Sequence, residues 1–207
     1  MHKKLGTLLI VLGALCVAGA VSLYLFNRDQ GQQAYEIAEA RMAPLTEAIA
    51  RKAQAPARQG SAWEMPEATD SAEDLPEEGI LVDGLWYLGY LTIPAMDLQL
   101  PVALNLEDDV LEDMPCRYSG GLETKDLVIA AHNYTRQFGE ISKLQPGQTV
   151  ELTDGHGRVQ RYQVEQVETL SAYEVERMTA GDWDMTLFTC TYGGRDRWAV
   201  RCRQTTE

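Results

Sequence analysis

The sequence predicts a mainly β fold, a barrel or a sandwich, preceded by an N-terminal membrane-spanning helix. Three observations predict it. Residues 5–26 contain no charged side chain, residues 27–54 have helical composition, and short β-prone runs separated by turns follow from residue 85. The 207-residue chain therefore divides into a cytoplasmic tail (1–4), a span (5–26), a juxtamembrane helix (27–54), an acidic linker (55–84) and a globular domain (85–207).

The run at 5–26 has the length of a transmembrane helix. At about 1.5 Å of rise per residue, it covers a hydrocarbon layer of about 30 Å. A cleaved signal peptide is the alternative, because Ala18-Gly19-Ala20 has the small residues of a cleavage site. The run continues to Phe26, past the usual length of a signal-peptide core, which favours a retained single-pass anchor.

The charges that flank the span predict its orientation. His2, Lys3 and Lys4 precede the span, whereas Arg28 and Asp29 follow it and cancel each other. Under the positive-inside rule, the N-terminus is cytoplasmic and the domain lies outside the cell.

The part after the span is strongly acidic. The chain has a net charge of −13, and all 31 of its acidic residues follow the span. Phosphate backbones require clusters of Lys and Arg, so this composition argues against nucleic acid as a partner. The sequence also lacks a CxxC pair and a GxxxxGK[ST] loop, which leaves zinc and nucleotide chemistry without support.

Two segments connect the span to the domain. In 27–54, apolar residues recur at helical spacing, and Pro44 is expected to kink or split the helix. This helix either packs on the domain as a spacer or is a solvated stalk. Between residues 64 and 83 there are eight acidic residues and no Lys or Arg, which favours a flexible linker over a lid lying across a groove.

The domain itself is expected to contain many short strands. Alternation and apolar runs predict strands at 86–93, 98–102, 127–131, 149–153, 158–170, 185–190 and 198–202, and short helices at 110–114 and 173–178. The glycines around His156 predict a hairpin turn between the fourth and fifth of these strands.

Four cysteines raise the question of disulfides. Cys16 lies in the span, and the other three, Cys116, Cys190 and Cys202, are an odd number, so at least one thiol should be free. Cys116 and Cys202 either pair or remain as two packed thiols, and the second interpretation is favoured.

Cys190 is the candidate nucleophile. It ends the β-prone run 185–190, precedes an arginine-containing loop, and is followed by a second β-prone run that starts at Trp198. A strand end holds a side chain rigidly, and nearby positive charge favours the thiolate, which is the reactive form.

A cysteine nucleophile needs a nearby base, and the chain has three histidines. His2 is cytoplasmic in this topology and His156 lies in the hairpin turn, which leaves His132 at the end of the apolar run 127–131. Periodicity alone favours a capping or hydrogen-bonded loop histidine at this position.

Several motifs point instead to a catalytic pair. The stretch Thr186-Leu187-Phe188-Thr189-Cys190 resembles the T-L-x-T-C signature of the sortases, the membrane-anchored cysteine transpeptidases of Gram-positive bacteria. Residues 127–133 are similar to the segment that carries their catalytic histidine, and 138–150 to the stretch after it. Residues 89–94 and 100–102 resemble the first strands of the family, and Arg197 matches the arginine that opens the last strand. The resemblance covers roughly residues 85–203, and the N-terminal anchor also suits the family.

The resemblance implies a closed eight-stranded β-barrel with short helices and a mechanism. Cys190 would attack a carbonyl of an LPxTG-like sorting signal and form a thioester. His132 would protonate the leaving amine and later take a proton from the incoming amine, and Arg197 would stabilise the oxyanion. Arg195 is the alternative for the arginine role.

The resemblance also suggests neighbours of the reaction. Thr189, Asn133 and Tyr134 are the candidate substrate-binding residues. No cofactor or metal site is predicted. Some sortases bind calcium through loop carboxylates, but no spacing in this sequence assigns such a site.

The implied substrates are surface proteins or pilins that carry a sorting signal. The acceptor would be an amine of a peptidoglycan precursor or a pilin lysine. The subclass stays open, although the region of His132 looks closest to class B. A cysteine hydrolase and a non-catalytic anchored binding module on the same barrel are the alternative functions.

Overall fold

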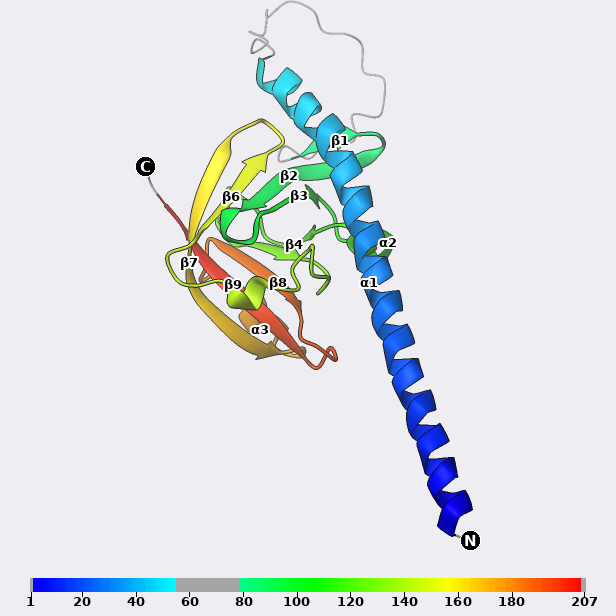
Figure 1. Ribbon diagram of the computed structural model, residues 1–207. Coiled ribbons are helices and arrows are strands. Elements are labelled where there is room, and N and C mark those ends of the chain that lie inside the picture. The colour runs from blue at the N-terminus through cyan, green and yellow to red at the C-terminus, as the bar shows by residue number, and fades with distance from the viewer. Residues whose placement is uncertain (1, 55–78, 206–207) are drawn as a thin grey trace, which may run out of the picture.

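The structure, a computed structural model, describes residues 2–54 and 79–205, and shows one long helix lying against a β-barrel (Figure 1). Its elements are α1 (His2–Gln54), β1 (Ile80–Val82), β2 (Leu85–Ile93), η1 (Pro94–Met96), β3 (Leu98–Ala103), α2 (Asp108–Asp113), β4 (Cys116–Ser119), β5 (Leu127–Ala130), η2 (Ile141–Lys143), β6 (Thr149–Asp154), β7 (Val159–Ser171), α3 (Val175–Met178), β8 (Met185–Cys190) and β9 (Asp196–Gln204).

The expected closed eight-stranded barrel is confirmed. The strands run in the order β2-β3-β4-β5-β8-β9-β7-β6, and β6 pairs back with β2 to close the ring. Strand β1 pairs with β2 from outside this ring. The β5–β8 pair is parallel, so the carboxyl ends of these two strands lie at the same end of the barrel.

Alternating apolar side chains build the core. On β5, Leu127 and Ile129 belong to the inner core, as do Met185 and Leu187 on β8. A second apolar cluster packs on the opposite face of these strands and consists of Val128, Leu170, Met178 and Ala199, with Tyr118 and Phe188 against them. Strand β5 is therefore buried on both faces, which accounts for its continuous apolar sequence.

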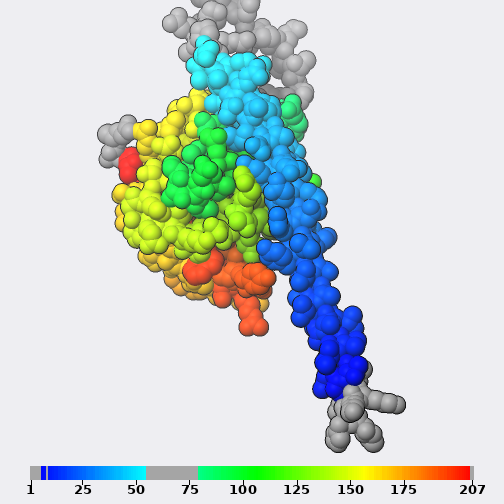
Figure 2. Space-filling model, in the orientation of Figure 1, coloured from blue at the N-terminus to red at the C-terminus, as the bar shows by residue number. Residues whose placement is uncertain are grey.

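The long helix α1 is continuous through Pro44, so the expected kink or split does not occur. Within its described part, an 18-residue window has a mean hydropathy of 2.4 and none of it is buried, which meets the length and composition of a membrane span. Its C-terminal half packs on the domain through Ala34, Ala38, Leu45 and Ile49, which are buried. Figure 2 shows this half against the barrel and the N-terminal part projecting beyond it. The helix is therefore a packed spacer and not a solvated stalk.

Two strands, β1 and β4, were not predicted from the sequence. Strand β1 lies in the segment expected as a linker, where Asp83 and Gly84 at positive φ (49° and 80°) turn the chain back so that Ile80 pairs with Tyr87. The rest of that segment, residues 55–78, lies outside the described residues. Strand β4 is only four residues long and its pairing with β5 is interrupted by a bulge after Arg117, so it lacks a periodic pattern.

The cysteines follow the favoured interpretation. Cys116 and Cys202 are buried free thiols, not a disulfide. Burial raises the pKa of each to about 12, which makes both thiols unreactive.

Candidate active site

Three neighbouring strand ends bring the predicted catalytic residues together. In the β8–β9 register, Cys190 is the direct partner of Arg197. In the parallel β5–β8 register, Ala130 is level with Phe188, and the amide of Ala131 donates to the carbonyl of Phe188, so His132 begins directly after the part of the chain that is bonded to β8. Adjacent strands are about 4.8 Å apart. The topology therefore places thiol, imidazole and guanidinium at one end of the barrel.

Cys190 is the accessible thiol of the domain. It is half-buried, whereas Cys116 and Cys202 are fully buried. It follows Thr189, which is buried, and by strand alternation it shares its face with Phe188 and not with the core residue Leu187. The end of β8 thus presents the sulfur outward.

Thr189 ties the nucleophile strand to the histidine loop. Its buried hydroxyl donates to the carbonyl of Ala131 at 2.8 Å, and the amide of Ala131 donates to the carbonyl of Phe188 at 3.2 Å. Both bonds fix the residue directly before His132. The hydroxyl of Thr189 is thus committed inside the protein, which argues for a positioning role and against the expected contact with substrate.

The loop after β5 is held by a buried glutamine that sequence reasoning missed. The amide of His132 donates to Oε1 of Gln137 at 3.2 Å, and Nε2 of Gln137 donates to the carbonyl of Asp113 at 3.0 Å. Gln137 is fully buried. A lone glutamine in a polar loop gives no sequence signal, because its partner at the end of α2 is 24 residues away.

A close approach inside the same loop requires glycine. A Cβ atom on Gly139 would lie 2.5 Å from the carbonyl oxygen of Asn133. The amide of Gly139 donates to the carbonyl of Tyr134 at 2.9 Å. The loop thus folds tightly back on the residues after His132.

The environment of His132 favours the neutral imidazole. Burial lowers its pKa, and the carboxylate of Glu112 on α2 acts in the opposite direction. The ring of Tyr134 stacks on the imidazole, with centroids 5.1 Å apart and 29° between the planes. Asn133 between them is exposed. Of the two candidate substrate-binding residues in this loop, Tyr134 contacts His132 directly.

Arg197 lies at the start of β9, where the β8–β9 loop ends, and its side chain is held by carbonyls of that segment. Its Nη1 donates to the carbonyls of Gly194 at 2.9 Å and Asp196 at 3.0 Å. Arg195 is exposed in the loop itself and has no strand partner in the β8–β9 pairing. The register therefore favours Arg197 over Arg195 as the arginine beside Cys190.

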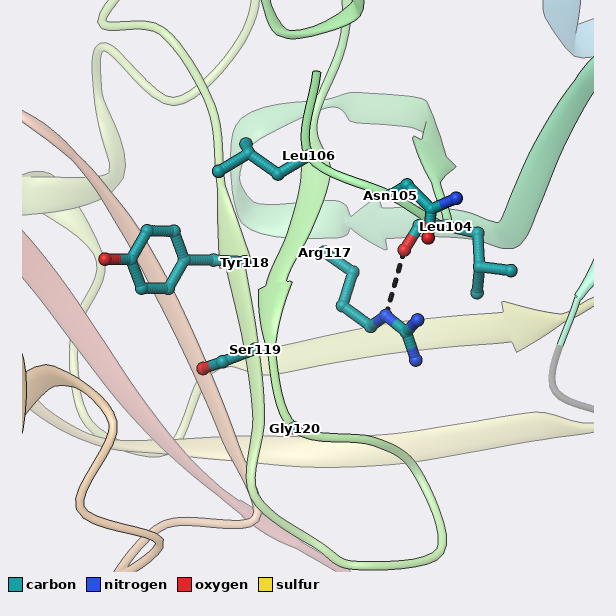
Figure 3. Close-up of a pocket in the computed structure, with 7 residues that line it drawn as sticks. All are labelled: Leu104, Asn105, Leu106, Arg117, Tyr118, Ser119 and Gly120. Carbon is teal, nitrogen blue, oxygen red and sulfur yellow. Dashed lines mark hydrogen bonds between the residues drawn. The ribbon is translucent and has the colours of Figure 1, made fainter. Parts of the chain in front are cut away.

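A hollow of about 350 Å³ lies beside β4 and is lined by Leu104, Asn105, Leu106, Arg117, Tyr118, Ser119 and Gly120 (Figure 3). Arg117 points to one side of β4, where its Nε donates to the carbonyl of Leu104 at 2.9 Å, and Tyr118 points to the other. The ring of Tyr118 meets that of Phe188 edge-on, with centroids 5.1 Å apart. The hollow thus adjoins a residue two positions before Cys190.

In the described part of the chain, no group of three or more His, Cys, Asp or Glu side chains is placed to hold a metal ion.

Comparisons with known proteins identify the family. The family model described as Sortase domain matches residues 91–205, which is more than half of the chain. A search of curated proteins found no match.

Solved structures share the fold. Sortase C1 of Streptococcus agalactiae superposes with a TM-score of 0.52 at 23% identity, over 61% of this chain and 72% of that chain. The Clostridium perfringens sortase D5 transpeptidase has a TM-score of 0.50 at 22% identity, over 57% of this chain and 78% of that chain. Sortase A of Corynebacterium diphtheriae has a TM-score of 0.51 at 19% identity, over 57% of this chain and 60% of that chain. These structures carry the same barrel as this chain. With the family model matched across the barrel, the chain belongs to the sortase family of transpeptidases.

Proposed function

We propose that the protein is an extracytoplasmic sortase that cleaves an LPxTG-like sorting signal and transfers the new carboxyl end to an amine. The observation that supports this proposal is the strand register, which pairs Cys190 with Arg197 and ends β5, the strand before His132, beside β8 at the same end of the barrel. The accessible thiol beside a guanidinium is what acyl transfer through a thioester requires.

The proposed reaction has two halves. The thiolate of Cys190 attacks the scissile carbonyl carbon, and the carbon–nitrogen bond breaks as the imidazolium of His132 protonates the departing amine. An acceptor amine then attacks the thioester, gives its proton to His132 and releases the thiolate. Burial lowers the pKa of His132, which favours the neutral imidazole over the imidazolium that the first half of the reaction uses.

Arg197 is proposed to stabilise the oxyanion of both tetrahedral intermediates. The carbonyls of Gly194 and Asp196 hold its Nη1 and keep the guanidinium beside the cysteine strand. Its other N–H groups would then donate to the oxyanion and to the substrate backbone.

The substrate is proposed to lie along the outer face of β8. Phe188 and Tyr118 would contact an apolar side chain of the sorting signal, and the hollow beside β4 continues from them. Asn133 and Tyr134 would border the same groove at the histidine loop. Thr189 would support this arrangement from within through its bond to Ala131.

The protein is proposed to be a single-pass membrane protein with a cytoplasmic N-terminus. The orientation of the barrel supports this. Gly31, near the apolar end of α1, packs on Tyr134 at the catalytic end, whereas Ile49 packs on Gly157 in the β6–β7 turn. The β8–β9 loop also points toward the N-terminal half of α1 (Figure 1). The catalytic end would therefore face the membrane, where sorting signals of surface proteins or pilins emerge. The acceptor amine would come from a peptidoglycan precursor or a pilin lysine.

The test uses the full chain in detergent micelles or nanodiscs with a panel of sorting-signal peptides. Wild-type protein should cleave a peptide and, with triglycine present, give the ligated product by mass spectrometry, and Cys190→Ala should give neither. Equal processing by Cys190→Ala and wild type would overturn the catalytic proposal. Cleavage that never gives a ligated product with any amine would identify a hydrolase instead.

A further inference from the structure

We propose that residues 31–35 of α1 position the catalytic histidine through Tyr134, so that the anchor helix is a working part of the active site. This inference rests on the proposed catalytic role of His132. It makes Gly31, Tyr35 and Tyr134 positioning residues for the reaction, because they act through His132 and not on the substrate.

The first contact is between Gly31 and Tyr134. A Cβ atom on Gly31 would lie 3.3 Å from Cβ and from Cγ of Tyr134, tighter than ordinary van der Waals contact. Glycine weakens the interior of a helix relative to alanine. Glycine at this position lets the helix backbone approach the Tyr134 side chain, which a larger residue would push away.

The second contact lies one turn further along the helix. The guanidinium of Arg136 sits over the ring of Tyr35, 3.7 Å from its centroid, in the geometry of a cation–π interaction. Residues four apart on a helix share one face, so Gly31 and Tyr35 meet the same loop together. The helix thus contacts two residues of the histidine loop, Tyr134 and Arg136.

Tyr134 carries this contact to the imidazole. Its ring stacks on His132 with 5.1 Å between centroids. Its backbone carbonyl also accepts bonds from the amides of Gln137 and Gly139, both at 2.9 Å. A displacement of Tyr134 would therefore move both the ring on the imidazole and the bonds that shape the loop.

The other supports of the loop act on the backbone. Thr189 and Phe188 of β8 hold Ala131, and Gln137 joins the His132 amide to α2. The loop has no regular secondary structure from 131 to 134. Helix α1 acts on the aromatic ring against the imidazole, and so bears on the orientation and burial of the catalytic side chain.

The test compares two glycines of the same helix in the full chain. Gly31→Leu introduces a side chain where Tyr134 is close, whereas Gly19→Leu is the matched control, because a Cβ there meets nothing within 4 Å. Gly31→Leu should lower kcat at least about tenfold with KM within about twofold, since small misplacements of a catalytic group are costly. The unfolding temperature should match that of Gly19→Leu.

A second readout follows His132 itself. NMR titration of histidine-labelled protein should show the pKa of His132 moving back toward that of a free imidazole in Gly31→Leu, because its burial by Tyr134 is lost. Tyr35→Ala should change both kcat and this pKa in the same direction by less, and Tyr35→Phe, which keeps the ring under Arg136, should restore them.

The two proposals fail differently. If His132 titrates alike in wild type, Gly31→Leu and Gly19→Leu, the helix does not position it and the inference is overturned, whatever the activity. If wild-type protein turns over no sorting peptide, the proposed function fails. The titration difference between the two leucine variants then still decides whether α1 bears on His132. Should Gly31→Leu fold poorly, the Tyr35 pair gives the same comparison without the larger side chain.

Discussion

The two halves of the proposed active site are built differently. Cys190 and Arg197 lie on adjacent antiparallel strands and are direct partners in the β-ladder, so the sheet alone sets their spacing. His132 lies beyond the end of β5, in a loop that is held by contacts with three other elements, β8, α2 and α1. The half formed by Cys190 and Arg197, the ladder half, is held by the hydrogen bonds of the sheet. The half formed by His132, the loop half, depends on particular residues that are distant in the sequence. Substitutions of Cys190 or Arg197 should therefore remove a reacting group, whereas substitutions around the loop should keep the imidazole of His132 but shift its position.

The largest effect should come from Arg197. Arg197→Ala should lower kcat/KM by about 10²–10³-fold, the typical cost of losing one oxyanion donor. Arg195→Ala is the matched control and should stay within about twofold, because Arg195 is exposed and outside the β8–β9 pairing. Peptide ligation followed by mass spectrometry measures both. A larger loss in Arg195→Ala would exchange the roles of the two arginines.

Gln137 should be the most sensitive support of the loop half. Gln137→Ala leaves the Asp113 carbonyl and the His132 amide without their side-chain partner. Stability should fall by about 1–3 kcal/mol, the cost of buried polar groups left unsatisfied. Because the loop also shifts, kcat should fall by at least about tenfold.

The control for Gln137 is Gln163→Ala, which removes an exposed glutamine bonded to the Gly147 carbonyl. It should change stability by less than about 0.5 kcal/mol, as surface substitutions usually do. Chemical denaturation and single-turnover ligation measure the two quantities. Unchanged kcat in Gln137→Ala would mean that β8 and α1 suffice to hold His132.

A substitution of Thr189 should have a smaller effect, because its hydroxyl makes only one of the two hydrogen bonds that join β8 to Ala131. Thr189→Val keeps the shape and removes the donor to Ala131 at 2.8 Å. The expected loss is about 1–2 kcal/mol of stability with a few-fold lower kcat and an unchanged KM. Thr169→Val, at an exposed position of β7, is the control. A raised KM in Thr189→Val would restore the substrate-binding role expected from the sequence.

The same division explains what the sequence could predict. Strand β8 was predicted with its observed bounds, and the partnership of Cys190 with Arg197 follows because a short turn joins the two strands. His132 was identified by elimination among three histidines and by resemblance, since a strand end gives its position but not its supports. Gln137, Tyr35 and Gly31 were not predicted as residues that contact the loop around His132. Their partners lie on other elements, and single-sequence patterns carry no information on such contacts.

The short strands β1 and β4 were not predicted from the sequence for a related reason. Strand β1 is three residues long and follows an acidic stretch, so local composition favoured a linker. Its pairing with β2 and the burial of Ile80 stabilise it, and both are tertiary effects. Long alternating runs such as β7 were predicted well because their pattern repeats over 13 residues.

The smallest effect should be electrostatic and should come from Glu112. Its carboxylate favours the charged imidazole and so raises the pKa of His132 against the lowering by burial. Glu112→Gln removes this contribution, and the pKa should fall further below its ordinary value. At a fixed neutral pH a smaller fraction of molecules then holds the imidazolium together with the thiolate. The acidic limb of the kcat/KM profile should therefore move to lower pH, and its plateau should drop by a few-fold at most.

Asp109→Asn on the same helix α2 is the matched control. Asp109 acts on Asp113 and Cys116, and is not among the charges that bear on His132. NMR titration of His132 in the two variants separates a specific carboxylate from the general acidity of α2. Equal shifts in both variants would assign the effect to the whole acidic helix. The loop half of the site would then depend on the field of α2 and not on one of its residues.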